Sequence, residues 1–201
     1  MTGVRQLLVA LAYLLGSFPT AYLAVRLAGR GDVRRIGSGN VGATNALRAA
    51  GWKLALLVLL VDVGKGALAV WLMRRATHDP GWVALAGLAA IAGHCFPVWL
   101  RFEGGKGVAT LAGVYGTIAP RALVVVAGIW LVAFGLSRIV ALASLLAAAA
   151  LPIAVYFVLR PPAPVMVATV LVAIVVMWRH RGNLQRIVRG EEPRFGKGEK
   201  P

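Results

Sequence analysis

Long apolar stretches alternate with short polar segments along nearly the whole chain. The stretches are long enough to predict membrane helices, although several are shorter than the roughly 20 residues that a perpendicular span needs. The number of predicted helices depends on a break at Pro120 and Arg121. With the break the chain has seven helices; without it the fourth and fifth merge, and the chain has six. The predicted helices lie near Val4–Leu27, Lys53–Met73, Trp82–Cys95, Gly107–Ala119, Ala122–Leu136, Ile139–Leu159 and Pro164–Trp178.

The composition supports this pattern. Hydrophobic residues make up 59% of the chain and charged residues only 14%, and the mean hydropathy is +0.78. Such a chain cannot cover a soluble core with a polar surface, so we expect an all-α, polytopic membrane protein with residues 1–201 as one domain. Cys95 is the only cysteine, which excludes an internal disulfide, and no Cys/His spacing predicts a metal or cofactor site.

The distribution of Lys and Arg predicts the orientation. With seven helices and the N-terminus outside, fifteen basic residues fall in cytoplasmic segments and five outside, which is a positive-inside bias. This orientation brings polar segments at about 29–52, 94–107 and 179–201 to the cytoplasmic face. The net charge of +15 then reflects this bias and attraction to anionic lipid, and nucleic-acid binding has little support.

The first polar segment has the chemistry of a phosphate site. Its glycines leave backbone N–H groups accessible, its Ser, Asn and Thr side chains donate and accept, and Arg48 adds a cationic fork. The run Gly37–Gly42 also matches the dinucleotide pattern Gly-x-Gly-x-x-Gly, but that pattern requires a preceding strand, and here a membrane helix precedes it. The candidate residues are Gly37, Ser38, Gly39, Asn40, Thr44, Asn45 and Arg48.

The second polar segment resembles a phosphate cradle. Gly104, Gly105 and Gly107 permit unusual backbone angles, and the next helix directs its positive N-terminal end toward Lys106. Leu100 and Val108 stand where a Walker A loop needs Gly and Ser or Thr, so it is not that motif. The alternative is a plain glycine turn with a lysine that snorkels to the membrane surface.

Two further pairs of polar residues are candidates. Asp62 and Lys65 share one face of a membrane helix, where either charge alone would cost about 2.5 to 3.5 kcal/mol. They either form a structural ion pair, or Lys65 lies at the floor of a cytoplasmic pocket. His180 and Asn183 share a face in the tail, where a basic stop signal is the simpler interpretation.

These motifs, in order, resemble the PlsY family of bacterial acyl-phosphate-dependent glycerol-3-phosphate acyltransferases. The resemblance rests on the two polar segments, Asp62 with Lys65-Gly66, Gly93-His94 with Phe96-Pro97, the tail pair His180-x-x-Asn183, and Gly16-Ser17-Phe18-Pro19. It covers nearly the whole chain. Glu103 stands where we expect a lysine, which affects only a peripheral contribution to substrate attraction.

The resemblance implies transfer of a fatty acyl group from acyl phosphate to the sn-1 hydroxyl of glycerol 3-phosphate, giving lysophosphatidic acid and phosphate. It also implies a monomer in the bacterial inner membrane with seven helices, a cytoplasmic active site, contact with membrane lipid and no cofactor or metal. The implied catalytic residues are Ser38, Arg48, Lys106, His180 and Asn183. The implied phosphate-binding residues are Gly37, Gly39, Asn40, Thr44, Asn45, Arg48, Lys65, Gly104, Gly105 and Lys106.

The residue types fit this chemistry, because two phosphate-bearing substrates need fixed counter-charges such as Arg48, Lys65 and Lys106. The chain has no His-x-x-x-x-Asp pair, so the proton acceptor is either a substrate phosphate or Ser38 in a relay; a Ser38 acyl-enzyme lacks an adjacent base.

A transporter of a small phosphorylated anion is the competing class, although the second half does not repeat the first. A structural membrane subunit would leave the first polar segment and Lys106 without a purpose.

Overall fold

A computed structural model describes residues 2–196, all of whose regular elements are helices. Lys197 and Lys200, which were counted with the cytoplasmic tail, lie outside the described residues. The α-helices are α1 (Thr2–Ser17), α2 (Thr20–Leu27), α3 (Ala43–Ala50), α4 (Trp52–Ala76), α5 (Pro80–Cys95), α6 (Val108–Ile118), α7 (Pro120–Ser137), α8 (Val140–Leu159), α9 (Ala163–Arg179) and α10 (Arg181–Val188), with 3-10 turns η1 (Val33–Arg35) and η2 (Val98–Leu100).

Each apolar stretch of the sequence is helical, but the predicted number of spans is not established. Among residues 2–196, five helical segments are long and apolar enough to cross a membrane, or six if α9 and α10, bent by 57°, form one span. The α6 helix has only 11 residues. The predicted break at Pro120 is present, since α6 ends at Ile118 and α7 begins at Pro120, where a missing N–H is tolerated.

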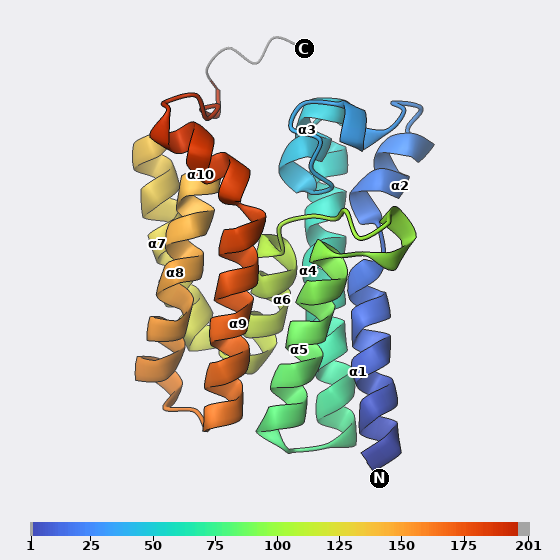
Figure 1. The fold of residues 1–201 in the computed structure, drawn as a ribbon, viewed down its shortest axis with the longest axis vertical. Coiled ribbons are helices and arrows are strands. Elements are labelled where there is room, and N and C mark those ends of the chain that lie inside the picture. The colour runs from blue at the N-terminus through green and yellow to red at the C-terminus, as the bar shows by residue number, and fades with distance from the viewer. Residues whose placement is uncertain (1, 197–201) are drawn as a thin grey trace. The chain divides into compact units, whose positions relative to one another are not determined.

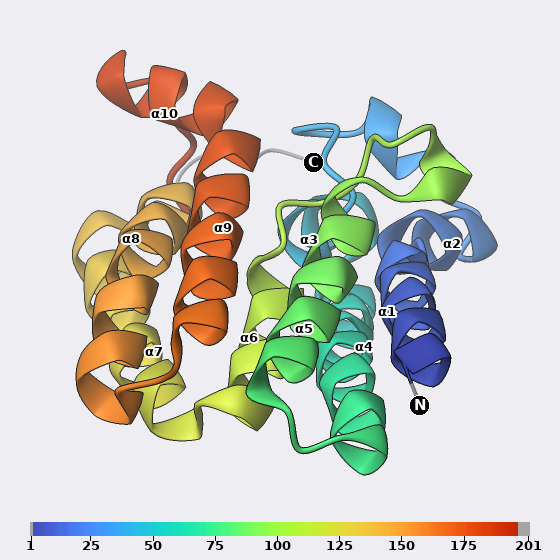
Figure 2. The ribbon, with the colours of Figure 1, turned by 60° about the horizontal axis from the view of Figure 1, so that its bottom comes forward.

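The chain forms two compact units, Met1–Ile118 and Ala119–Pro201. In the first unit α1 packs against α5, and α4 packs against α6 and α3 (Figure 1). The helices α3 and α2 and the segment between α5 and α6 lie at the end of this unit away from the N-terminus, in both views (Figure 2). Both polar segments of the first unit therefore lie at the same end.

Close helix packing in the first unit depends on glycine. A methyl group on Gly93 of α5 would lie 2.1 Å from the Tyr13 carbonyl oxygen of α1, and one on Gly16 would lie 2.0 Å from the Ala90 carbonyl oxygen. On α4, a methyl group at Gly66 would lie 2.3 Å from the Thr110 carbonyl oxygen of α6. These helices thus approach each other to backbone contact.

The first apolar stretch is interrupted, which the sequence prediction did not include. The α1 helix ends at Ser17 and α2 begins at Thr20, so Phe18 and Pro19 form a break inside one 25-residue span. Proline has no N–H to donate and its ring disrupts the preceding helical turn.

In the second unit α7 packs against α8, and α8 against α9 and α10. The Phe195 N–H donates to the Arg138 carbonyl at 2.7 Å, and the Phe195 ring lies edge-on to Phe134. These contacts attach the tail to the turn between α7 and α8.

Candidate functional site

The first polar segment is organised by one buried amide. Asn45, 1% exposed, donates both side-chain N–H groups, to the carbonyls of Val33 and Ile36 at 2.9 Å. Its Oδ1 accepts from the Ser38 N–H at 3.0 Å. Both donors of Asn45 are used within the segment, so Asn45 shapes it. Its direct contact with a phosphate stays a prediction.

The backbone beside the Asn45 amide requires glycine at position 37. Its φ is +54°, and a methyl group there would lie 2.6 Å from Asn45 Oδ1 and 3.1 Å from Arg48 Cδ. The stem of Arg48 therefore passes next to the backbone that carries Ser38. Ser38 is exposed, and Asn40, Thr44 and Arg48 are partly buried, so these side chains remain candidates for substrate contact.

The second polar segment folds back on the end of α5. The Gly104 N–H donates to the Cys95 carbonyl at 3.2 Å and the Gly105 N–H to the His94 carbonyl at 3.0 Å. These two N–H groups are thus bonded within the protein. Phosphate binding at Gly104 and Gly105 stays a prediction. Gly104 and Gly105 are buried, whereas Lys106 is partly exposed at the entry to α6.

One hydrophobic cluster holds the two polar segments together. It contains Val33, Val41 and Ala46 from the first segment and Leu100 from the second, packed with Val58 of α4 and with Ala21 and Val25 of α2. The grouping of these segments, expected from their shared cytoplasmic placement, therefore has a packing basis within the first unit.

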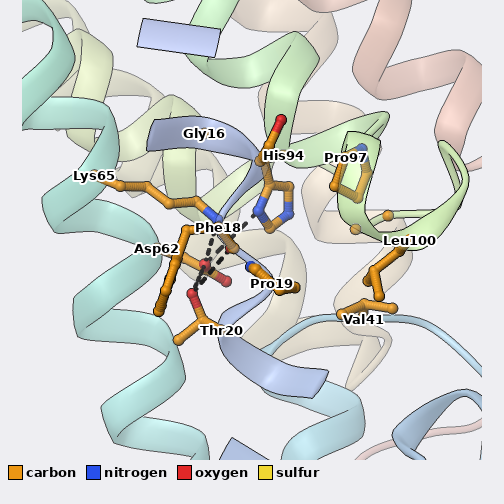
Figure 3. A pocket seen from close by; sticks show the side chains of 13 residues that line it. Gly16, Phe18, Pro19, Thr20, Val41, Asp62, Lys65, His94, Pro97 and Leu100 are labelled. Carbon is orange, nitrogen blue, oxygen red and sulfur yellow. Dashed lines mark hydrogen bonds and ion pairs between the residues drawn. The ribbon is translucent and has the colours of Figure 1, made fainter. Parts of the chain in front are cut away.

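Beneath these segments lies a cluster around the buried Asp62 carboxylate (Figure 3). Its Oδ1 accepts from the Thr20 hydroxyl at 2.9 Å and lies 2.8 Å from Lys65 Nζ and 3.7 Å from His94 Nδ1. Lys65 also donates to the Phe18 carbonyl at 3.1 Å, at the break between α1 and α2. The ion pair considered from the sequence is present, with two partners that the spacing did not indicate.

A cavity of about 10 Å³ adjoins this cluster, bordered by Lys65, His94, Val41, Gly104 and Gly105 among others. That volume is near the lower limit for one water molecule. The Asp62 cluster therefore borders a small cavity next to the second polar segment. Direct contact between Lys65 and a phosphate stays a prediction.

Asp32 and Arg34 fix the start of the first polar segment. Asp32 caps η1, accepting from the Arg34 backbone N–H at 3.0 Å, and its other oxygen lies 2.7 Å from Arg34 Nη2. The side-chain hydrogen bond from Arg34 is the main cause that lowers the pKa of Asp32 from 3.8 to about 2. Asp32 therefore stays ionised near neutral pH and is a weaker base than an ordinary carboxylate.

The two predicted tail residues lie in the second unit. His180, 2% exposed, places Nδ1 2.8 Å from the Val176 carbonyl, which can only accept, so Nδ1 carries a proton and a neutral ring has its lone pair on Nε2. Asn183 Nδ2 donates to Glu192 Oε1 at 2.6 Å, and Arg186 Nε donates to Glu192 Oε2 at 2.7 Å. The catalytic role of His180 and Asn183 stays a prediction.

Sequence reasoning missed the roles of Thr20, His94 and Glu192. The only signal for Glu192 was its place in a polar turn after a helix, and Thr20 follows the Phe18-Pro19 break. No local pattern indicates that Thr20, Asp62 and His94 meet, because 42 residues separate the first two. Among residues 2–196 no three His, Cys, Asp or Glu side chains gather as metal ligands would.

Comparison with known proteins gives the family. Residues 6–190 match the family model described as glycerol-3-phosphate acyltransferase. The chain belongs to this family. The glycerol-3-phosphate acyltransferase of Gloeobacter violaceus is 49% identical over 192 residues, 93% of each chain. That of Caulobacter vibrioides is 49% identical over 187 residues, 92% of this chain and 85% of the relative.

Solved structures of the family have the same fold. A crystal structure of PlsY, an integral membrane glycerol 3-phosphate acyltransferase in its glycerol 3-phosphate form, is 37% identical, with a TM-score of 0.91. The lysophosphatidic acid form is 36% identical, with a TM-score of 0.88, and each comparison covers 96% of both chains. The family resemblance inferred from the motifs is confirmed.

The hydrogen bonds of Asn45 generate a prediction. Asn45→Asp keeps the acceptor for Ser38 but loses both donors and places a carboxylate against two carbonyls. We expect a loss of stability of about 2 to 6 kcal/mol, because each buried acceptor left unsatisfied costs about 1 to 3 kcal/mol. Trypsin cleavage after the exposed Arg34 or Arg35 should accelerate, measured in detergent against Asn40→Asp as the control. Equal cleavage rates in the two variants would contradict the role given to Asn45.

Proposed function

We propose that this chain transfers a fatty acyl group from acyl phosphate to the sn-1 hydroxyl of glycerol 3-phosphate, releasing lysophosphatidic acid and inorganic phosphate. As a member of its family the chain is a glycerol-3-phosphate acyltransferase, and this reaction would be the first acylation of phospholipid biosynthesis. The observation that carries the proposal is the joining of the Arg48 and Lys106 segments by one hydrophobic cluster. This places two cationic segments at one end of the first unit.

The residues can be given roles that agree with their surroundings. Arg48 and Lys106 would bind the phosphates, because cation-to-phosphate hydrogen bonds are strong and reduce repulsion between the two substrates. Ser38, Asn40 and Thr44 would donate to phosphate or to the oxyanion that forms during acyl transfer. Gly37, Gly39, Gly104, Gly105 and Asn45 would shape the segments that carry these groups. His180 and Asn183 are proposed as catalytic residues on the family resemblance.

The proposed step needs no enzyme nucleophile. The sn-1 hydroxyl oxygen attacks the carbonyl carbon of acyl phosphate, the tetrahedral oxyanion collapses, and the C–O bond to phosphate breaks. The hydroxyl proton passes to a phosphate oxygen, directly or through the Ser38 hydroxyl. Acyl phosphate is already activated, so the leaving group itself supplies the base.

We also propose a monomer in the bacterial inner membrane, with the N-terminus outside and the active site on the cytoplasmic side. The bias of fifteen basic residues against five supports this orientation. Exposed large apolar side chains on α4, α7, α8 and α9 fit helices in contact with lipid.

The donor can be tested directly. Purified protein in detergent should convert labelled glycerol 3-phosphate to lysophosphatidic acid with palmitoyl phosphate as the only donor and without added metal. Inorganic phosphate should appear one for one with product, and a chelator should not reduce the rate. Faster turnover with acyl-coenzyme A or acyl carrier protein would refute the donor, and turnover abolished by a chelator would refute metal-free catalysis. Gradient-dependent uptake into vesicles without product would favour the transporter.

The charge roles predict the effect of two substitutions. Arg48→Ala and Lys106→Ala should each lower kcat/KM about 10- to 150-fold, because a hydrogen bond to a charged group is worth about 1.5 to 3 kcal/mol. Arg30→Ala, an exposed arginine in the chain before η1, is the matched control and should retain activity. Near-wild-type kinetics in both test variants would show that the phosphates bind elsewhere.

The orientation predicts the accessibility of introduced cysteines. In a Cys95→Ser background, a cysteine at exposed His78 should react with an impermeant thiol reagent in intact cells. One at exposed Glu191 should react only after the membrane is opened. The reverse pattern, or reaction of both in intact cells, would contradict the orientation.

A further inference from the structure

The Asp62 cluster reaches the segment that carries Lys106 through His94. At one edge of the imidazole, Nδ1 lies 3.7 Å from Asp62 Oδ1. At the other, a methyl group built on Gly105 would lie 2.1 Å from Nε2 and 2.7 Å from Cε1. The ring is therefore wedged between a buried carboxylate and the backbone one residue before Lys106.

The backbone of His94 holds the same segment. The His94 carbonyl accepts from the Gly105 N–H at 3.0 Å, and the next carbonyl, of Cys95, accepts from the Gly104 N–H at 3.2 Å. Two backbone hydrogen bonds thus attach the Gly104–Gly105 segment to the end of α5, and the segment packs against the imidazole. His94 is 7% exposed, so a shift of its ring has to be transmitted to neighbouring atoms rather than to solvent.

The partners of Asp62 fix the carboxylate from several directions. Thr20 approaches from α2, Lys65 from α4 and His94 from α5, as Figure 3 shows. A carboxylate with these partners, 2% exposed, has little freedom to turn. It can therefore hold the imidazole in one orientation, as an outer carboxylate orients a functional histidine.

We propose that Asp62 and His94 are positioning residues for Lys106: Asp62 orients the imidazole, and the imidazole sets the path of Gly104–Gly105 and hence the place of the Lys106 ammonium. This inference rests on the phosphate role of Lys106 in the proposed function. It assigns neither residue to proton transfer or to substrate contact. The packing of the His94 imidazole also explains why position 105 is glycine, because the imidazole occupies the space that a side chain there would need.

The main test variant is His94→Asn, whose amide nitrogen can take the place of Nδ1 and keep a donor for Asp62 while removing the edge against Gly105. We expect kcat/KM for glycerol 3-phosphate to fall about 10- to 100-fold, since a displacement of about 1 Å can cost a factor of 10². The matched control is His78→Asn, in the exposed turn between α4 and α5, which should retain wild-type kinetics.

A kinetic double-mutant cycle separates positioning from general stability. If His94 acts through Lys106, His94→Asn should cost less than about threefold in a Lys106→Ala background, although its effect on the melting temperature should be the same in both backgrounds. Independent losses that multiply would overturn the inference while leaving the proposed function intact. Wild-type activity of Lys106→Ala would overturn both. If His94→Asn yields no folded protein, Asp62→Asn replaces it in the cycle with the same expected outcomes.

A second arm tests the contact itself. Gly105→Ala should reduce kcat/KM strongly in the wild-type background, because the added methyl meets the imidazole. In a His94→Ala background the methyl enters the vacated space, so the same substitution should cost less than about threefold. An equal loss in both backgrounds would show that the ring does not set the path of the segment.

Discussion

The first unit depends on the cost of burying the Asp62 carboxylate in an apolar helix bundle. A carboxylate in such surroundings is stable only with partners, and removing one partner of a buried ion pair is strongly destabilising. Its partners come from three helices, and one of them, Lys65, also binds the Phe18 carbonyl where the first span is broken. The Asp62 carboxylate thereby links the break between α1 and α2, the helices α4 and α5, and the segment before Lys106.

The helices could be predicted from the sequence because each apolar stretch is bounded by residues with a clear local effect. Pro120 both stops α6 and begins α7, and Gly51, with φ of +83°, separates α3 from α4. The interruption at Phe18 and Pro19 was missed although Pro19 is a local signal for it, because the apolar stretch resumes directly after Thr20. Its stability depends on Lys65, a partner 47 residues away that periodicity cannot reveal.

The sequence indicates which segments carry the candidate site, but it does not show which of their donors the fold itself uses. Residue types marked Ser38, Arg48 and Lys106 as chemistry-bearing, and the hydrophobic cluster brings their segments together. The same reasoning named Asn45, Gly104 and Gly105 as phosphate-binding residues, and the fold uses their N–H groups for its own hydrogen bonds. A sequence shows which groups can donate, but the backbone path decides which donors are already used.

The glycine contacts between α1 and α5 and between α4 and α6 have a consequence for how this protein tolerates change. Its buried side chains are mainly Ala and Val, so most positions have few atoms to lose and little room to gain any. In a core of large side chains, truncation leaves cavities and is the usual source of damage. Here the greater hazard is enlargement, since even one added methyl group meets a backbone carbonyl of the neighbouring helix. The sequence is therefore constrained chiefly by an upper limit on side-chain volume.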